Sequence, residues 1–483
     1  MAYSPGHKMA DADPDILAID RGTITAPAGC GKTHLIADAL TRHTDAKPIL
    51  VLTHTNAGVV ALRSRLDKAG VPSRAYRLST IDGWAMRLIS TFPARGGHHP
   101  SILELKKPKT DYPAIRESAW KLLKAGHISD VLKSSYARLI VDEYQDCSIP
   151  QHAIIYYAAL SLPTCVLGDP MQAIFGFQGN ALADWEKHVC THFPIAGQLT
   201  TPWRWKNAGN DGFGLWLLDA RERLRTGQTV DLQSCPGNVQ WVHLDGTDDH
   251  KRRLEAAITP CPFPDGRVLI IGESISPPSQ RRIASQTPGA VVVESVDLKD
   301  LVAFAARLDF NSATAFSELV EFATDVMTNV GGSDLIKRVA SLKAGTAHKP
   351  PNSVEESALE FCAAPNRTAA LNLLVEMNKQ QGVRVHRPAV LRSCITAFRT
   401  ADGTPGNTFH DAVVREREKN RLIGRPLPKR AVGSTLLLKG LEADVAVVLN
   451  ADELDARNLY VAMTRGSAKL VVCAKSPTLN PAI

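Results

Sequence analysis

The chain has 483 residues, a hydrophobic fraction of 44%, nine cysteines and a formal net charge of +7. This length exceeds one ordinary hydrophobic core, so roughly two to four domains are expected. The mild basic charge permits a polyanionic partner without requiring one. No apolar run reaches membrane-spanning length, Met1–Asp15 is too polar for a signal peptide, and the cysteines follow no disulfide or zinc-binding pattern, so we expect a cytoplasmic protein.

A phosphate-binding loop is the first functional motif. Residues 26–33 fit the P-loop pattern except that alanine replaces the first glycine, and a strand over 23–25 and a helix over 34–40 are expected to flank them. Backbone amides would hold the phosphates of a nucleotide, Lys32 would reach the β- and γ-phosphates, and Thr33 would bind Mg²⁺. Cys30 is either a reactive thiol or a small residue at a serine-like position. The nucleotide-binding residues are therefore expected to be Ala26, Pro27, Ala28, Gly29, Cys30, Gly31, Lys32, Thr33 and His34.

The alternation of strands and helices continues after this loop and is then interrupted. The expected elements are a strand over 48–53, a helix over 57–69, a strand over 74–78, and helices over 85–90, 115–125 and 128–133. Residues 93–137 form a small insertion that begins with a loop over 93–112. The residues expected at the tips of the two strands are His54, Thr55, Asn56, Asp82 and Trp84.

An acidic cluster follows the next strand. Leu139–Val141 predicts a short buried strand, and it runs directly into Asp142 and Glu143. One interpretation is a solvated acidic strand end. The other is a partner for hydrated Mg²⁺ on a nucleotide, because carboxylates are costly to bury alone. The P-loop favours the second interpretation.

The remaining elements predict an α/β protein. Those expected are strands over 164–169, 239–242, 267–271 and 290–293, helices over 298–325 and within 331–430, and a closing strand, helix and strand over 443–449, 459–464 and 469–473. Repeated strand–polar tip–helix units indicate a parallel, doubly wound sheet. A basic run lies near the end of the helical region, and it is either a solvated helix face or a phosphate-backbone contact. Its members are Arg415, Arg417, Lys419, Arg421, Arg425, Lys429 and Arg430.

Several segments together resemble superfamily 1A DNA helicases of the UvrD/Rep/PcrA type. In chain order they are 26–33, 52–56, 142–146, 168–177, Pro202-Trp203-Arg204, 439–442 and 459–465. The resemblance implies an α/β fold with two RecA-like P-loop NTPase domains. It divides the chain into a first RecA-like domain (1–92 and 138–206), an insertion (93–137), a second RecA-like domain (207–330 and 431–483) and a reduced helical accessory region (331–430).

The resemblance also implies roles in ATP hydrolysis. Asp142 would hold Mg²⁺ through its water shell, Glu143 would polarise the attacking water, and Gln172 would sense the γ-phosphate. Arg204 and Arg465 would come from the second domain as arginine fingers, which stabilise transition-state charge. Trp203 would stack on adenine, or alternatively fill the core. Glu442 would bind the ribose.

Other positions match DNA-facing residues of the family. Phe177 corresponds to its base-stacking aromatic, and base stacking grips single strands with little sequence preference. His54, Thr55, Asn56, Asp82 and Trp84 correspond to its DNA-facing motifs, although a buried core role is equally open for Trp84.

Some features depart from the family pattern. No glutamine precedes the P-loop at the usual distance, and Gln178 stands where arginine is usual. Leu436–Leu438 lack the histidine and serine that the family has in the motif matched by 439–442, and the region 331–430 is small. We expect an ATP- and Mg²⁺-dependent helicase or translocase that moves on single-stranded or tailed DNA in the 3′→5′ direction. The alternative is a DNA-stimulated ATPase that acts as a sensor or regulatory subunit of a partner nuclease, as in Gabija-type phage defence.

Overall fold

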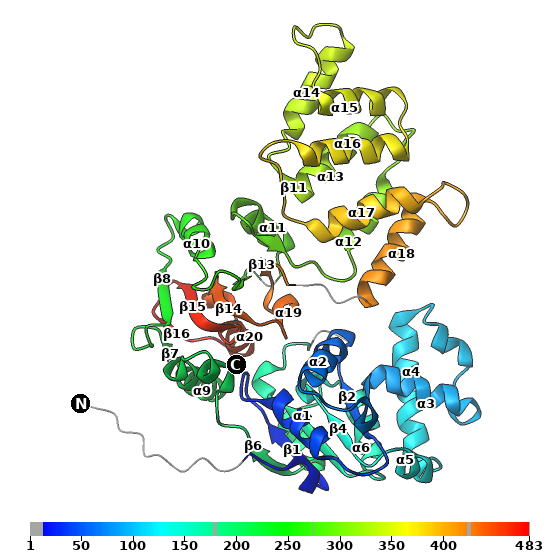
Figure 1. The fold of residues 1–483 in the computed structure, drawn as a ribbon, viewed down its shortest axis with the longest axis vertical. Helices are drawn as coiled ribbons and strands as arrows, with labels where there is room; N and C mark the ends of the chain where they lie inside the picture. Colours follow the sequence, from blue (N-terminus) through cyan, green and yellow to red (C-terminus); the bar gives the residue numbers. More distant parts are fainter. Residues whose placement is uncertain (1–12, 177–180, 274, 423–426, 483) are drawn as a thin grey trace. The chain divides into compact units, whose positions relative to one another are not determined.

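A computed structural model describes residues 13–176, 181–273, 275–422 and 427–482 (Figure 1). The chain forms two compact units. Unit 1 comprises Met1–Val230, Leu454–Thr464 and Asn480–Ile483, and unit 2 comprises Asp231–Glu453 and Arg465–Leu479. Each unit contains one six-stranded parallel sheet, which confirms the expected α/β class. The four-part division of the chain stays a prediction.

The unit 1 sheet brings three polar strand ends to one edge. Its strands are β1 (Arg21–Thr25), β2 (Ile49–Thr53), β3 (Tyr76–Thr80), β4 (Leu139–Val141), β5 (Thr164–Gly168) and β6 (Ile195–Gln198). Their order is β3-β2-β4-β5-β1-β6, and every printed pairing is parallel. The P-loop, Asp142 and Asp169 follow the adjacent strands β1, β4 and β5. They therefore share the carboxyl edge, where open α/β sheets bind ligands.

Helices cover both faces of this sheet (Figure 1). The helices of unit 1 are α1 (Lys32–Arg42), α2 (Asn56–Lys68), α3 (Ile81–Thr91), α4 (Pro108–Lys124), α5 (Ser129–Ser135), α6 (Ile149–Ala158), α7 (Cys190–His192), α8 (Trp203–Asn207), α9 (Asp211–Arg225) and α20 (Ala456–Met463). Two expectations were wrong at their boundaries. α3 begins at Ile81, because the Thr80 hydroxyl accepts from Gly83 N and caps the helix. α4 begins at Pro108, inside the expected loop, with proline in its first turn.

Unit 2 contains the second sheet. Its strands are β8 (Val239–His243), β9 (Val268–Ile271), β10 (Val291–Val292), β13 (Arg430–Gly433), β14 (Ala443–Val448) and β15 (Gly466–Ala474), in the order β10-β13-β9-β14-β15-β8. The other elements near this sheet are α10 (Asp249–Ala257), α11 (Pro277–Gln286), α19 (Thr435–Leu438) and the short strands β7 (Val230–Asp231) and β16 (Thr478–Leu479). Apolar runs such as Val445–Val448 are buried, as strands covered on both faces require.

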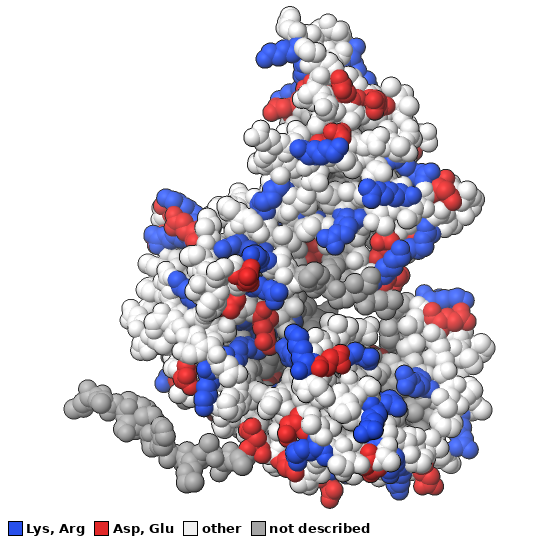
Figure 2. Space-filling view, in the orientation of Figure 1, with Lys and Arg blue, Asp and Glu red and all other residues white. Residues whose placement is uncertain are grey.

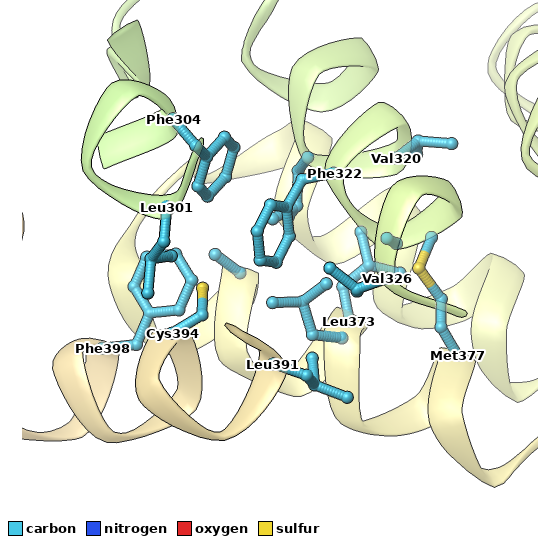
Figure 3. Packing of buried hydrophobic residues seen from close by; sticks show 14 of the residues in the cluster. Leu301, Phe304, Val320, Phe322, Val326, Leu373, Met377, Leu391, Cys394 and Phe398 are labelled. Atoms are coloured by element: carbon cyan, nitrogen blue, oxygen red, sulfur yellow. The ribbon is translucent and has the colours of Figure 1, made fainter. Parts of the chain in front are cut away.

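Seven helices of unit 2 share one hydrophobic core. They are α12 (Lys299–Arg307), α13 (Ala315–Val326), α14 (Gly332–Lys343), α15 (Ser353–Ala363), α16 (Arg367–Lys379), α17 (Pro388–Thr400) and α18 (Phe409–Leu422), with β11 (Met327–Thr328) antiparallel to β12 (Arg384–Val385). Figure 3 shows Phe304 and Phe322 side by side in this core, with ring centroids 4.2 Å apart. The helical character expected for 331–430 is confirmed.

A buried arginine links this helical core to the sheet of unit 2. Arg387, before α17, donates to Glu294 (2.6 Å), to Asp300 (2.8 Å) and to Asp325. Glu294 lies just after β10, whereas Asp300 and Asp325 lie on α12 and α13. A buried charge persists only when it is paired, so this cluster fixes the helices against the sheet strand.

The described members of the basic run have local acceptors. Arg417 pairs with Glu418, Lys419 with Glu416 and Lys429 with Asp265. Arg415 and Arg430 donate to backbone carbonyls, while Arg425 and the side chain of Arg421 lie outside the described residues. Figure 2 shows both signs of charge interspersed on the face in view. These contacts favour the solvated-face interpretation.

Among the described residues, no helix combines the length and apolarity needed to cross a membrane.

A buried histidine makes the stability of unit 1 dependent on pH. Nδ1 of His152 lies 2.8 Å from the Tyr144 hydroxyl, and Nε2 lies 2.8 Å from His192 Nδ1. Burial, with help from His192 and His188, lowers the pKa of His152 to about 4. Because this pKa is lower in the folded state than its ordinary value of 6.5, the contribution to stability is complete above pH 6.5 and is lost as the pH falls through 4.

We expect acidification from pH 7 to pH 4.5 to destabilise wild type by about 2 kcal/mol more than it destabilises a His152→Gln variant. The measurement is urea unfolding of both proteins at each pH. Carboxylates titrate alike in both proteins, so the difference isolates the histidine. Equal pH dependence in the two proteins would contradict the assignment.

Candidate nucleotide-binding site

The P-loop has the backbone that anion binding requires. Gly29 and Gly31 have φ angles of 72° and 89°, in the left-handed region that glycine adopts without strain. Gly31 is the N-cap of α1, and among the described residues no side chain caps this end. The first amides of α1 are therefore available to a phosphate, and the helix dipole favours negative charge there.

Lys32 lies between the two carboxylates of the acidic strand end. Its Nζ is 2.9 Å from Asp142 Oδ1 and also bonds Glu143 Oε1. Burial would lower the pKa of Lys32, but the two carboxylates outweigh it and the pKa is raised, so the ammonium keeps its proton. Burial raises the pKa of Asp142.

The donor set fits Mg²⁺ and a nucleotide. The Thr33 hydroxyl and the Asp142 carboxylate are hard oxygen ligands, which Mg²⁺ prefers. Arg65, on α2, donates to Thr33 Oγ1 over 3.1 Å and was missed by the sequence reasoning.

Cys30 is buried, and burial raises the pKa of its thiol to about 12. This favours the small-residue interpretation over a reactive thiol.

Two tryptophans of α8 flank the loop in different ways. Trp203 is 37% exposed, and a Cβ on Gly31 would lie 2.9 Å from its Cδ1 atom. Trp205 is 1% exposed and closes over Gly29. The core role considered for Trp203 is therefore wrong, and the neighbouring Trp205 fills the core instead. The adenine-stacking role of Trp203 stays a prediction.

Arg204 lies beside the P-loop within unit 1. Its amide donates to Gly29 O (3.0 Å) and its Nη1 to Thr464 O (2.6 Å). The expectation that it comes from the second domain was wrong, because the chain leaves unit 1 only at Val230.

Arg465 and Glu442 lie in unit 2. Arg465 is buried and donates to Leu441 O (3.2 Å), while Glu442 is exposed, and both roles stay predictions.

The tip of β5 carries Gln172 in a buried network. Gln172 Nε2 donates to Asp169 Oδ2 over 3.1 Å, and Asp169 pairs with Arg221 of α9. Tyr460, on α20, accepts from Ala28 N of the P-loop over 3.1 Å. Sequence reasoning missed Arg221 and the role of Tyr460. Arg221 carries no motif signal, whereas Tyr460 lies inside the 459–465 motif.

The expected nucleic-acid residues divide into two groups. His54 lies near Phe175 (centroids 5.6 Å apart), Thr55 caps α2, and Asn56 is exposed at its first position. Asp82 and Trp84 lie in α3 and not at a strand tip, which corrects the expectation.

Neither residue of α3 is available to DNA in this structure. Asp82 holds Arg116 through two bonds of 2.8 and 2.7 Å, and Trp84 is 1% exposed in the core. For Trp84 the buried alternative is correct. Phe177 lies outside the described residues.

Residues 101–187 match the family model of the UvrD/REP helicase N-terminal domain. This segment of the chain is therefore similar to the N-terminal domain of UvrD-like helicases. The matched range contains Asp142, Glu143 and Gln172. No curated protein matches the chain. A solved complex of Arterivirus nonstructural protein 10, a helicase, with DNA is similar at 12% identity and a TM-score of 0.28, over 52% of this chain and 48% of that chain. We draw no conclusion from so low a score.

Proposed function

We propose that this chain is a UvrD-like helicase, which hydrolyses ATP with Mg²⁺ at the P-loop and moves along single-stranded DNA in the 3′→5′ direction. The observation that carries the proposal is the contact of Lys32 with both Asp142 and Glu143 at the mouth of the P-loop. This contact joins the phosphate-binding group to the two carboxylates that hydrolysis needs.

Each residue has a distinct role in the proposed reaction. Lys32 transfers from the carboxylates to the β- and γ-phosphates, and Thr33 and Asp142 hold Mg²⁺, which neutralises phosphate charge when bound. Glu143 then orients and polarises the attacking water. Gln172 contacts the γ-phosphate, and Arg204 lies beside the loop to stabilise transition-state charge.

The end of β2 is the proposed DNA contact in unit 1. α2 begins directly after β2, so its first turn lies at the same carboxyl edge of the sheet as the P-loop, and Asn56 is exposed there. His54, Thr55 and Asn56 would bind the DNA backbone, which accounts for grip without sequence preference.

The decisive experiment is steady-state ATP hydrolysis with single-stranded DNA, blunt duplex or RNA, followed by strand displacement on duplexes with a 3′ or a 5′ tail. We expect stimulation of kcat of roughly tenfold or more by single-stranded DNA, and displacement only with the 3′ tail. Omitting Mg²⁺ is the control for metal dependence. Failure to hydrolyse ATP under every condition would contradict the proposal.

A second proposal is a DNA-stimulated ATPase that regulates a partner nuclease, for example in phage defence. It is motivated by the small helical region of residues 331–430. Stimulation by duplex ends without strand displacement would favour this function, and copurification with a nuclease would identify the partner. Displacement of tailed strands by the isolated chain would favour the motor.

A further inference from the structure

A buried glutamine connects Glu143 to the neighbouring strand of the unit 1 sheet. Gln145 follows β4 and is 2% exposed. Its Nε2 donates to Glu143 Oε2 over 2.5 Å, and its Oε1 accepts from the backbone N–H of Asp169 over 3.1 Å. Both polar atoms of the Gln145 amide are therefore hydrogen-bonded, and these two bonds connect the acidic end of β4 to the tip of β5.

The tip of β5 is itself held rigidly. The Asp169 carboxylate is fully buried and accepts from Met171 N, from Gln172 Nε2 and from two nitrogens of Arg221, at distances of 2.6 to 3.1 Å. Arg221 lies on α9. A chain of hydrogen bonds thus runs from Glu143 through Gln145 and Asp169 to that helix.

The backbone on both sides is adapted to this glutamine. A Cβ on Gly168 would lie 2.6 Å from Gln145 Oε1, so only glycine leaves room for the amide. Glu143 has φ 54° and ψ 41°, a left-handed conformation that is unfavourable for a residue with a side chain. Such conformations persist where surrounding contacts hold them, commonly at functional sites.

We propose that Gln145 is a positioning residue for ATP hydrolysis, which fixes the Glu143 carboxylate relative to the β5 tip that carries Gln172. The inference rests on the proposed function of Glu143. Gln145 holds one carboxylate oxygen, Oε2, whereas Lys32 bonds the other, Oε1. An amide is suited to this task because it orients the carboxylate without adding a charge that would weaken it as a base.

The test is a Gln145→Met variant, which keeps the side-chain length and loses both hydrogen bonds. We expect kcat for ATP hydrolysis to fall by about 10- to 100-fold, because small misplacements of a catalytic group cost rates of this order. KM for ATP should stay within about threefold, because the P-loop contacts are unchanged.

Gln151→Met is the matched control. Gln151 is as buried, at 0% exposed, but bonds Ser148 and Asp82 and not Glu143. We expect its kcat to equal that of wild type. Gln145→Met in a Glu143→Gln background should cause no further loss, because there is no carboxylate left to position. Wild-type kcat in Gln145→Met, or the same fold-loss in both backgrounds, would overturn the inference.

A conservative variant covers the case in which methionine prevents folding. Gln145→Glu accepts from Asp169 N but cannot donate to Glu143, so the same loss of kcat is expected, and full activity would overturn the inference. Failure of the proposed function is distinguishable, because wild type itself would then hydrolyse no ATP.

Discussion

Glu143→Gln is expected to lower kcat for ATP hydrolysis by about 10²- to 10⁴-fold while ATP still binds. The substitution keeps the side-chain shape but removes the carboxylate that takes a proton from water. Lys32 keeps Asp142 as a partner at 2.9 Å, so the phosphate-binding group stays in place. Single-turnover hydrolysis with single-stranded DNA measures the chemical step, and titration with a fluorescent ATP analogue measures binding.

Glu117→Gln is the matched control for this variant. Glu117 lies on the exposed face of α4, where it pairs with Lys121 over 2.5 Å. Surface pairs of this kind contribute little, so both kcat and ATP affinity should equal those of wild type. If Glu143→Gln kept more than about a tenth of wild-type kcat, another group would have to be the base.

Arg221→Met is expected to destabilise unit 1 by about 3–5 kcal/mol. Asp169 is fully buried, and Arg221 gives it two hydrogen bonds in a site with almost no access to water. Truncating the arginine leaves a buried carboxylate without its counter-ion. Urea unfolding followed by tryptophan fluorescence reports on this unit, because six of the seven tryptophans lie in it.

Arg223→Met tests whether burial is the cause. Arg223 lies on the same helix and pairs with Asp219 over 2.6 Å, but both side chains are exposed. Its loss should change the free energy of unfolding by less than about 0.5 kcal/mol. Adding Asp169→Asn to Arg221→Met should recover part of the stability, because the unpaired charge is removed. Equal effects of the two arginine variants would contradict the prediction.

The strands and the P-loop could be predicted because their signals are local. Leu139–Val141 is a short apolar run that ends in acid, and the structure places it as β4 at the centre of the sheet. By contrast, Gln145 meets Asp169 across 24 positions and Arg221 meets Asp169 across 52. Contacts of this range follow from the order of the strands and the path of α9, neither of which has a periodic signature.

The errors at Trp203, Asp82 and Trp84 concern residues at the starts of helices. Trp203 and Trp205 are separated by one residue, and which of them is buried depends on how α8 lies over the P-loop. Asp82 and Trp84 look like a polar strand tip, but the cap formed by Thr80 starts α3 early. Asp82 then turns toward Arg116 and Trp84 toward the core.

The strand order of unit 2 has a consequence for synthesis of the chain. β8, β9 and β10 emerge first, yet no two of them are neighbours in the sheet, and their partners β13, β14 and β15 begin only at Arg430. A nascent chain that ends before this residue therefore exposes three unpaired strands with open edges, which favours aggregation. The unit 1 sheet, whose last strand ends at Gln198, can pair long before. A ribosome-bound chain would thus carry a paired first sheet and need a chaperone for the second.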